Sequence, residues 1–245
     1  MKAIIIDDEP LARLMVREYL QFYPQMEVVQ ECGDGFEGVK AIMQHQPDLV
    51  FLDIQMPKIN GFEMLELLEQ PPAVIFTTAF DAYALKAFET HAVDYLLKPF
   101  SQERFDRALE KFLNQAPVQR EAATQALLQS AGSLPQQAGR IVVKNAGKIQ
   151  IIAVPEIQYL EAADDYVRIH TRGGIFLKNK TLGHFEKTLP EAQFVRVHRS
   201  YLVNVSEITR IDPYEKENHL ATLKSGARVP VSKAGYPRLK AVLGL

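Results

Sequence analysis

The sequence predicts an α/β domain with a doubly wound, five-stranded parallel sheet, followed by a linker and a mostly-β domain. Three changes of pattern along the chain lead to this prediction. Residues 1–115 alternate short apolar runs, rich in β-branched residues, with segments of helical periodicity. Residues 116–139 are rich in Gln, Ala, Pro and Ser and nearly uncharged, as linkers often are. Residues 140–245 hold short strand-like runs separated by turn residues.

Each predicted strand of the first domain is a short, continuous apolar run, which is typical of a sheet covered on both faces. These strands are Lys2–Ile6, Val28–Cys32, Leu49–Leu52, Val74–Thr77 and Tyr95–Leu97. The predicted helices repeat apolar residues every three or four positions. They are Leu11–Phe22, Phe36–His45, Phe62–Leu68, Ala82–Glu89 and Glu103–Leu113. In such sheets the ligand site lies at the carboxyl ends of the strands.

The second domain is predicted to be mostly antiparallel β. Its expected strands are Ile141–Lys144, Ile149–Val154, Ile157–Leu160, Tyr166–Thr171, Ile175–Lys178, Val195–His198, Tyr201–Asn204, Ile208–Ile211, His219–Leu223 and Arg228–Val231. Hairpin turns are expected at Gly147, at Gly173 and Gly174, and at Gly226, because glycine accepts the backbone angles of tight turns. The expected helices are Leu182–Thr188 and Pro237–Val242, with a further helical pattern at Glu121–Ser130 in the linker.

The composition limits the function classes. With 47% hydrophobic and 24% charged residues among 245, the chain has the composition of a soluble globular protein. No apolar run reaches the ~18–20 residues that a membrane span needs, and the amino terminus has no export signal. The single cysteine, Cys32, excludes an intramolecular disulfide. We therefore expect a cytoplasmic protein that does not insert into membranes.

The charge is divided unequally between the two domains. Residues 1–115 hold 10 Lys and Arg against 19 Asp and Glu, a net charge of −9. Residues 140–245 hold 17 Lys and Arg against 10 Asp and Glu, a net charge of +7. A basic half most often binds nucleic acid. Two domains whose charges merely differ are the alternative.

Three carboxylates are expected to meet at one edge of the first sheet. Asp7, Asp8 and Asp53 follow apolar strands at their carboxyl ends, and Thr78 and Lys98 follow the fourth and fifth strands. Carboxylates this close repel one another unless a cation joins them, and Mg²⁺ prefers such oxygen ligands. One carboxylate can then attack phosphorus to form an acyl phosphate, while Lys98 and Thr78 contact the phosphoryl oxygens. A metal-dependent phosphohydrolase uses similar residues and is the enzyme alternative.

A glycine-rich motif offers a competing, nucleotide-binding interpretation. Gly33, Gly35 and Gly38 match G-x-G-x-x-G between a predicted strand and a predicted helix, and Asp53 lies 20 residues after Gly33. The motif follows the second strand rather than the first, however, and it leaves the other residues at the strand ends without a role. A turn followed by a helix start is the preferred interpretation of these glycines.

The first domain resembles the receiver domains of bacterial response regulators, which have a flavodoxin-like fold. The resemblance covers about residues 1–115 and rests on the stretches IIIDDE, FLDIQMPKINGFEML, TTAFDAYALKAFE and AVDYLLKPF. It implies that Asp53 accepts a phosphoryl group beside an acidic pocket of Asp7 and Asp8. It also implies that Asp8, Asp53 and the backbone carbonyl of Gln55 bind Mg²⁺.

The same resemblance assigns further residues and a partner. Thr78 and Tyr95 form the switch pair, Lys98 contacts the phosphoryl group, and the Lys98–Pro99 peptide bond is cis. The phosphoryl group comes from a sensor histidine kinase, and the domain has no enzyme activity beyond slow self-dephosphorylation. Phosphorylation is expected to promote dimerisation through the fourth and fifth helices.

Basic residues interleave with aromatic and β-branched ones in the second domain, as in YVRIH and RVHRSY. Strand alternation places Arg196 and His198 on one face, and Val195, Val197 and Arg199 on the other. A solvated face is the ordinary explanation of such a charged row. The net charge of +7 nevertheless favours contact with phosphates.

The second domain resembles the LytTR-type DNA-binding domains over about residues 140–245, in the segments EAADDYVRIHT, FVRVHRSYLVN and ARVPVSKAGY. The resemblance implies a compact, mostly-β domain that inserts loops into successive major grooves. The DNA-contacting residues that it implies are Arg199, Lys233, His198, Arg168, Tyr166 and Asp165. Arg199 and Lys233 are the best candidates for base contacts. Which residue of the 165–168 loop touches DNA is left open, and His198 either bonds to DNA or braces its loop.

Together the two resemblances imply a transcriptional regulator of the LytR/AlgR family. Its phosphorylation is expected to promote dimerisation and binding to paired sites on double-stranded DNA, expected as direct repeats in promoters. Two alternatives stay open: a regulator that binds DNA without being controlled by phosphorylation, and an output domain that binds RNA.

Overall fold

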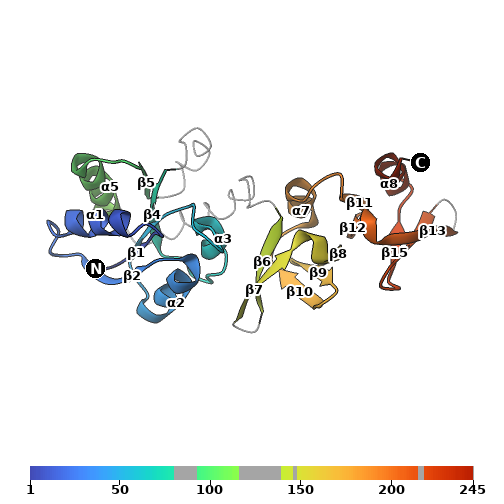
Figure 1. Ribbon diagram of the computed structural model, residues 1–245, viewed down its shortest axis with the longest axis horizontal. Coiled ribbons are helices and arrows are strands. Elements are labelled where there is room, and N and C mark those ends of the chain that lie inside the picture. Colours follow the sequence, from blue (N-terminus) through green and yellow to red (C-terminus); the bar gives the residue numbers. More distant parts are fainter. Residues whose placement is uncertain (80–92, 116–138, 146–147, 215–217, 245) are drawn as a thin grey trace. The chain divides into compact units, whose positions relative to one another are not determined.

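The computed structural model describes residues 1–79, 93–115, 139–145, 148–214 and 218–244 (Figure 1). The chain forms two compact units, Met1–Leu134 and Pro135–Leu245. The predicted helices Ala82–Glu89 and Glu121–Ser130 and the turn at Gly147 lie outside the described residues. So does the predicted linker except for its last residue, and its limits therefore stay a prediction.

The first unit contains the predicted parallel sheet, with strands in the order β2-β1-β3-β4-β5. The strands are β1 (Lys2–Ile6), β2 (Glu27–Cys32), β3 (Leu49–Leu52), β4 (Ala73–Thr78) and β5 (Asp94–Leu97). The described helices are α1 (Pro10–Leu20), α2 (Gly35–His45), α3 (Gly61–Leu65) and α5 (Gln102–Asn114). Every predicted strand of this sheet is confirmed. The strands β1, β3 and β4 are apolar and almost entirely buried, as expected of a sheet that is covered on both faces.

The helices cover both faces of this sheet, with α1 and α5 on one side and α2 and α3 on the other (Figure 1). On the first side, Val16 and Leu20 of α1 and Phe105 and Phe112 of α5 are buried in one core with Phe51 of β3. The rings of Phe51 and Phe105 stack with centroids 5.3 Å apart. This packing fixes the sheet whose carboxyl edge carries the predicted site.

The helix α3 is shorter than predicted, because it ends at Leu65 rather than at Leu68. The backbone N–H groups of Leu67 and Leu68 donate to the carbonyls of Met64 and Leu65, both at 3.1 Å. These bonds span three residues instead of four, so the chain tightens into turns where the sequence still has helical periodicity.

The glycine-rich motif begins a helix, as the preferred interpretation expected. Asp34 caps α2, and its side chain accepts hydrogen bonds from the backbone N–H groups of Phe36 and Glu37. A Cβ atom at Gly38 would lie 2.7 Å from Ile6 Cδ1. The glycines therefore allow α2 to approach the sheet closely.

The second unit contains three antiparallel sheets, with strand orders β10-β9-β8-β12-β11, β13-β14-β15 and β6-β7. The strands are β6 (Arg140–Asn145), β7 (Lys148–Ala153), β8 (Ile157–Ala163), β9 (Tyr166–Thr171), β10 (Gly174–Lys178), β11 (Phe194–His198), β12 (Tyr201–Asn204), β13 (Ile208–Tyr214), β14 (Asn218–Leu223) and β15 (Arg228–Val231). The turns at Gly174 and Gly226 have positive φ angles of 140° and 83°, which confirms glycine's role there.

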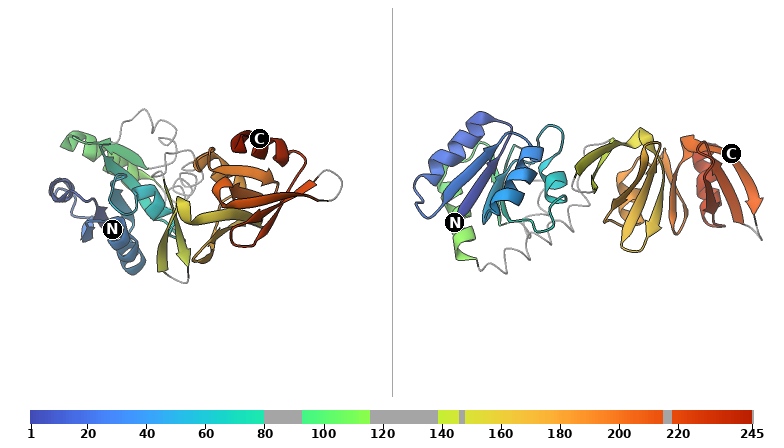
Figure 2. Two further views of the ribbon diagram at one scale, coloured as in Figure 1. Left: turned by 45° about the vertical axis from the view of Figure 1, so that its right-hand side comes forward. Right: turned by 90° about the horizontal axis from the view of Figure 1, so that it is seen from below.

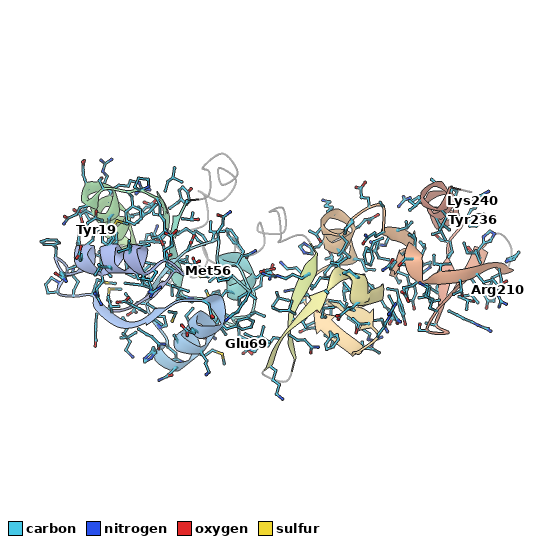
Figure 3. The ribbon with its side chains drawn as sticks, in the orientation of Figure 1. Tyr19, Met56, Glu69, Arg210, Tyr236 and Lys240 are labelled. Carbon is cyan, nitrogen blue, oxygen red and sulfur yellow. The ribbon has the colours of Figure 1, made fainter. Side chains whose placement is uncertain are left out.

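Between the described strands lie the short helical segments η2 (Val154–Glu156), α7 (Leu182–Thr188) and η3 (Val205–Glu207), and α8 (Gly235–Leu243) follows β15. Leu182 and Phe185 of α7 are buried in the core of the five-stranded sheet. The helix α8 contributes Leu239 to a second core with β11, β12, β14 and β15. Figure 2 shows α8, in dark red near the carboxyl terminus, beside the orange and red strands of this unit. Tyr236 of α8, labelled in Figure 3, stacks on His219 with ring centroids 3.6 Å apart. These contacts fix the position of α8, which follows directly after the segment that carries Lys233.

Among the residues that the structure describes, no helix is both long enough and apolar enough to span a bilayer.

Phe105→Ala is expected to destabilise the first unit by about 3–5 kcal/mol, because it removes a ring buried between helix and sheet. Phe22→Ala is the control, since that ring is 68% exposed whereas Phe105 is 0% exposed. Urea unfolding followed by far-UV circular dichroism measures both variants. Equal shifts of the first unit's midpoint would contradict the packing described for α5.

Candidate functional site

Three carboxylates of the first unit lie together, as predicted. One carboxylate oxygen from each of Asp7, Asp8 and Asp53 lies within 4.8 Å of the other two. Asp7 and Asp53 are buried, at 1% and 5% exposure, whereas Asp8 is exposed. The parallel pairing of β1 with β3 places these strand ends side by side. The cluster therefore opens to solvent on the side of Asp8.

Lys98 supplies positive charge to this cluster from the end of β5. Its Nζ lies 2.7 Å from Asp7 Oδ2, 3.4 Å from Asp53 Oδ2 and 3.2 Å from Glu9 Oε2. Its backbone N–H donates to the carbonyl of Thr78 at 2.8 Å, and the following bond to Pro99 is cis, as predicted. Glu9 had no predicted role, although the run of three acidic residues at 7–9 was its signal in the sequence.

The ionisation of this pair follows from burial and from opposite charge. Burial raises the pKa of Asp7 to about 6, although Lys98 and the backbone N–H of Glu9 stabilise the charged form. Burial lowers the pKa of Lys98, but pairing with Asp7 and the charge of Asp53 outweigh this effect and raise it overall. Lys98 is thus held charged between two carboxylates.

The donor set fits a hard divalent cation. With Glu9 included, the cluster holds four carboxylates and one ammonium group, so it carries an excess of negative charge when all are ionised. Its oxygen ligands and its exposed side suit Mg²⁺, which retains several waters when it binds. The Asp53 carboxylate also accepts the backbone N–H of Gln55 at 3.2 Å, which holds the loop carrying the Gln55 carbonyl beside the cluster.

The loop after β3 is held by close backbone packing. A Cβ atom at Gly61 would lie 2.5 Å from the carbonyl oxygen of Asp53, so only glycine permits this approach. The adjacent Asn60 and Glu63 form a capping box, in which each side chain accepts the other's backbone N–H at 2.8 Å. The start of α3 is therefore fixed against the predicted phosphoacceptor.

The predicted switch residues lie on neighbouring strands. Phe76 of β4 pairs with Tyr95 of β5, so Thr78, two residues further along β4, lies on the same face of the sheet as Tyr95. Thr78 is fully buried and Tyr95 is partly buried. Arg104 of α5 binds the Tyr95 carbonyl, which ties this strand to α5.

Three loops of the second unit, which carry the predicted DNA-contacting residues, are joined by hydrogen bonds. The β11–β12 turn contains Arg199, the β8–β9 turn contains Asp165, and the segment before α8 contains Lys233. Ala162 at the β8–β9 end donates its backbone N–H to Ser200 O at 2.9 Å. Ser232 donates both its backbone N–H, at 2.9 Å, and its hydroxyl, at 3.0 Å, to the carbonyl of Val197. The three loops therefore lie along one edge of the unit.

The position predicted for Arg199 was wrong. Strand alternation placed it on the face of Val195 and Val197, which are buried, but Arg199 is exposed in the turn after β11. The pairing of β11 with β12 shifts register between Arg196 and His198, and the strand ends at His198. Arg199 therefore lies beyond the last residue of β11, where the two-residue alternation of a strand no longer applies.

His198 braces the turn that it precedes. Its Nδ1 accepts the backbone N–H of Ser200 at 3.2 Å, which supports the bracing alternative. Burial and the charges of Arg199 and Arg196 lower the pKa of His198, and this favours the neutral ring that can accept a hydrogen bond. A contact of His198 with DNA stays a prediction.

The β8–β9 turn is a two-residue hairpin between Ala163 and Tyr166. Asp164 has a φ angle of 50°, a left-handed conformation that Asp tolerates better than most residues. Asp165 and Tyr166 are exposed, and Tyr166 keeps 46% of its surface accessible. Arg168 lies 3.6 Å from Glu161 of β8 and is about half exposed.

The segment carrying Lys233 packs directly against β11. Lys233 is exposed, whereas Gly235 two residues later is buried. A Cβ atom at Gly235 would lie only 1.9 Å from the Val197 carbonyl oxygen, so the two backbones touch. In the sequence, the signal for this approach is the glycine of the ARVPVSKAGY segment, which had no predicted role.

Comparison with known proteins agrees with both halves of this description. The family model described as "Response regulator receiver domain" matches residues 3–110, and the one described as "LytTr DNA-binding domain" matches residues 147–244. The chain is 34% identical to "Sensory transduction protein LytT" of Bacillus anthracis, over 99% of each chain. It is 37% identical to "Transcriptional regulatory protein BtsR" of Escherichia coli K12, over 100% of each chain.

Lys98→Gln is expected to destabilise the first unit by about 1–3 kcal/mol at pH 8, because a buried carboxylate loses its ionic partner. The penalty is expected to be smaller at pH 5. The pKa of folded Asp7, about 6, lies above its ordinary value, so the folded state holds a proton more strongly and stability falls as pH rises from about 4. Losing Lys98 raises this pKa further. Urea unfolding in EDTA at the two pH values measures the difference.

Lys58→Gln is the matched control for this variant. Lys58 pairs with Asp34 at 2.6 Å, but its side chain is 59% exposed, and exposed ion pairs contribute little to stability. We expect almost no change in the unfolding midpoint at either pH. Equal penalties for the two lysine variants would show that burial of the Asp7–Lys98 pair has no energetic consequence.

Proposed function

Because the chain belongs to the response regulators that join a receiver domain to a LytTR DNA-binding domain, it is a transcription regulator, and we propose that phosphorylation of Asp53 controls its binding to DNA. The observation that carries this proposal is the carboxylate of Asp53 beside Asp7, Asp8 and the ammonium group of Lys98. Asp53 has both a cation within 3.4 Å and an opening to solvent through Asp8.

The chemistry is a transfer of one phosphoryl group to Asp53. A carboxylate oxygen attacks phosphorus, an O–P bond forms, and the P–N bond of a phosphohistidine donor breaks with its electron pair left on the imidazole nitrogen. Lys98 then binds a phosphoryl oxygen, which offsets the charge that the group adds. Asp8, Asp53 and the Gln55 carbonyl would hold Mg²⁺, which neutralises phosphoryl charge when bound.

The new charge is transmitted through β4 and β5. In the proposed switch, the Thr78 hydroxyl turns towards the phosphoryl group and Tyr95 repacks on the same face of the sheet. In this proposal a sensor histidine kinase donates the phosphoryl group, and the phosphorylated chain forms a homodimer. Two DNA-binding domains held in one dimer engage paired sites, expected as direct repeats, more tightly than one domain does.

The three joined loops of the second unit are the proposed DNA-contacting surface. Arg199 and Lys233 are both exposed, and both come from loops tied to the backbone of Val197 or its neighbours. Arginine reads guanine through two hydrogen bonds, and lysine contacts the same edge as a point charge. Asp165, Tyr166 and Arg168 form the third part of the surface, and His198 supports it.

Acetyl phosphate with Mg²⁺ is expected to tighten binding to a fluorescent duplex from upstream of this protein's own operon about tenfold or more, through dimerisation on paired sites. Fluorescence anisotropy measures the affinity. Asp53→Asn keeps the shape of the side chain but not its nucleophilic carboxylate, so its affinity should not respond to acetyl phosphate.

Asp48→Asn is the matched control for this experiment, because Asp48 is exposed and precedes β3, whereas Asp53 follows β3. This variant should respond like the unchanged protein. Equal affinity with and without acetyl phosphate would support the alternative of a regulator that is not controlled by phosphorylation. Sustained release of inorganic phosphate, many groups per chain, would favour the phosphohydrolase instead.

Arg199→Ala and Lys233→Ala are each expected to lose about 1–3 kcal/mol of discrimination between a selected duplex and a scrambled one. Arg228→Ala is the control, because Arg228 is also exposed and begins β15, whereas Lys233 lies beyond the other end of that strand. It should weaken binding to both duplexes alike. If all three variants lose affinity without losing discrimination, the two loops contact phosphates rather than bases. Tighter binding to single-stranded or duplex RNA would favour the RNA-binding alternative.

A further inference from the structure

The turn that carries Arg199 is held by two side chains outside it, Arg196 of β11 and Glu186 of α7. We propose that this pair, called here the Glu186–Arg196 clamp, sets the sequence specificity of DNA binding by fixing the backbone that presents Arg199. The two residues are positioning residues, and neither contacts a base. The inference rests on the proposed DNA-binding function of the second unit and adds residues to it.

All three nitrogens of the Arg196 guanidinium group are engaged within the unit. Nε donates to the carbonyl of His198 at 2.8 Å, and Nη2 donates to the carbonyl of Arg199. Nη1 lies 3.3 Å from Glu186 Oε2. The side chain is only 21% exposed, so little of it is accessible to a phosphate. Its donors face the protein's own backbone instead.

Glu186 orients this guanidinium group from the opposite side. Its second oxygen, Oε1, lies 3.7 Å from Nη1 of Arg238 on α8. One carboxylate is therefore shared between Arg196 of β11 and Arg238 of α8, the helix that follows the Lys233 segment. Because a planar guanidinium group binds a carboxylate and two carbonyls in fixed directions, the clamp restricts the orientation of the turn as well as its position.

The clamp completes the hydrogen bonding of the turn. From Val197 to Ser200, each of the four carbonyls accepts a hydrogen bond: Val197 from Ser232, His198 and Arg199 from Arg196, and Ser200 from Ala162. Without the Arg196 side chain, the carbonyls of His198 and Arg199 lose the hydrogen bonds that it donates. The turn then keeps its ties at Val197 and Ser200 and the brace from His198, but the Arg199 carbonyl is no longer held by Arg196.

The effect of removing the negative charge of Glu186 distinguishes a positioning role from a purely electrostatic effect on DNA binding. Replacing Glu186 by Gln makes the basic domain more positive by one charge, which by itself strengthens binding to any DNA. A positioning role predicts the opposite effect on specific binding, because the clamp loses its ionic partner. Glu191 provides the comparison, since it is exposed in the turn before β11 and has no ion pair with the described residues.

The test uses the full chain and a duplex selected by the unchanged protein from a random library, together with a scrambled duplex of the same composition. Fluorescence anisotropy gives the ratio of the two affinities. Arg196→Lys keeps the charge but cannot span three acceptors, and it should lower the ratio about tenfold, the effect of losing hydrogen bonds to a charged group. Glu186→Gln should lower it about threefold, as expected when one partner of a partly exposed ion pair is lost. Glu191→Gln should leave the ratio unchanged or raise both affinities together.

Two results would overturn the inference. In the first, Glu186→Gln behaves like Glu191→Gln. In the second, Arg196→Lys keeps the full ratio, as expected of a residue that only contacts a phosphate. Unfolding midpoints in urea identify loss of folding, and if Arg196→Lys does not fold, Glu186→Gln decides alone because Glu186 is 41% exposed. Should the unchanged protein select no sequence at all, the proposed function fails and this inference fails with it.

Discussion

Like charges crowded at the carboxyl ends of β1 and β3 are the constraint on which the first unit depends. Two of the three carboxylates are buried, and in a medium of low dielectric their repulsion is far stronger than in water. Lys98 reduces this repulsion because it follows β5, which ends at the same edge of the sheet. The close approach of Gly61 to the backbone carbonyl of Asp53 holds the main chain of Asp53 against the start of α3. The carboxylates of the site therefore still repel one another, and a bound cation or a new hydrogen-bond donor would reduce this repulsion.

The second unit is organised differently, because its proposed DNA-contacting surface is built from loops rather than from the ends of strands. Loops hold a fixed geometry only when their backbone groups have partners, and here those partners come from neighbouring loops. Val197 O is the centre of this arrangement, because it accepts two donors from Ser232 and lies against Gly235. The basic charge of the domain supplies attraction to DNA, but this backbone packing decides where the charges are presented.

The elements of both units were largely predictable from the sequence, because they depend on local apolar patterns. The clustering of Asp7, Asp8 and Asp53 was predictable for the same reason, since parallel strands place their carboxyl ends together. The exposure of Arg199 was not, because β11 ends at His198 and Arg199 lies in the turn that follows, where strand alternation does not apply. The role of Arg196 was also missed, since nothing in its sequence neighbourhood distinguishes a guanidinium group in solvent from one bound to carbonyls.

The ties from Ala162 and Ser232 to the β11–β12 turn both include a main-chain N–H, which every residue except proline possesses. Changes of side chain at the tips of the three loops therefore leave those two ties in place. With the proposed DNA contacts at these tips, a family built on this scaffold can acquire new target sequences by exchanging a few exposed residues, without a change of the fold that presents them. The scaffold thus separates what a regulator of this kind recognises from what keeps it folded, and the two properties can evolve at different rates.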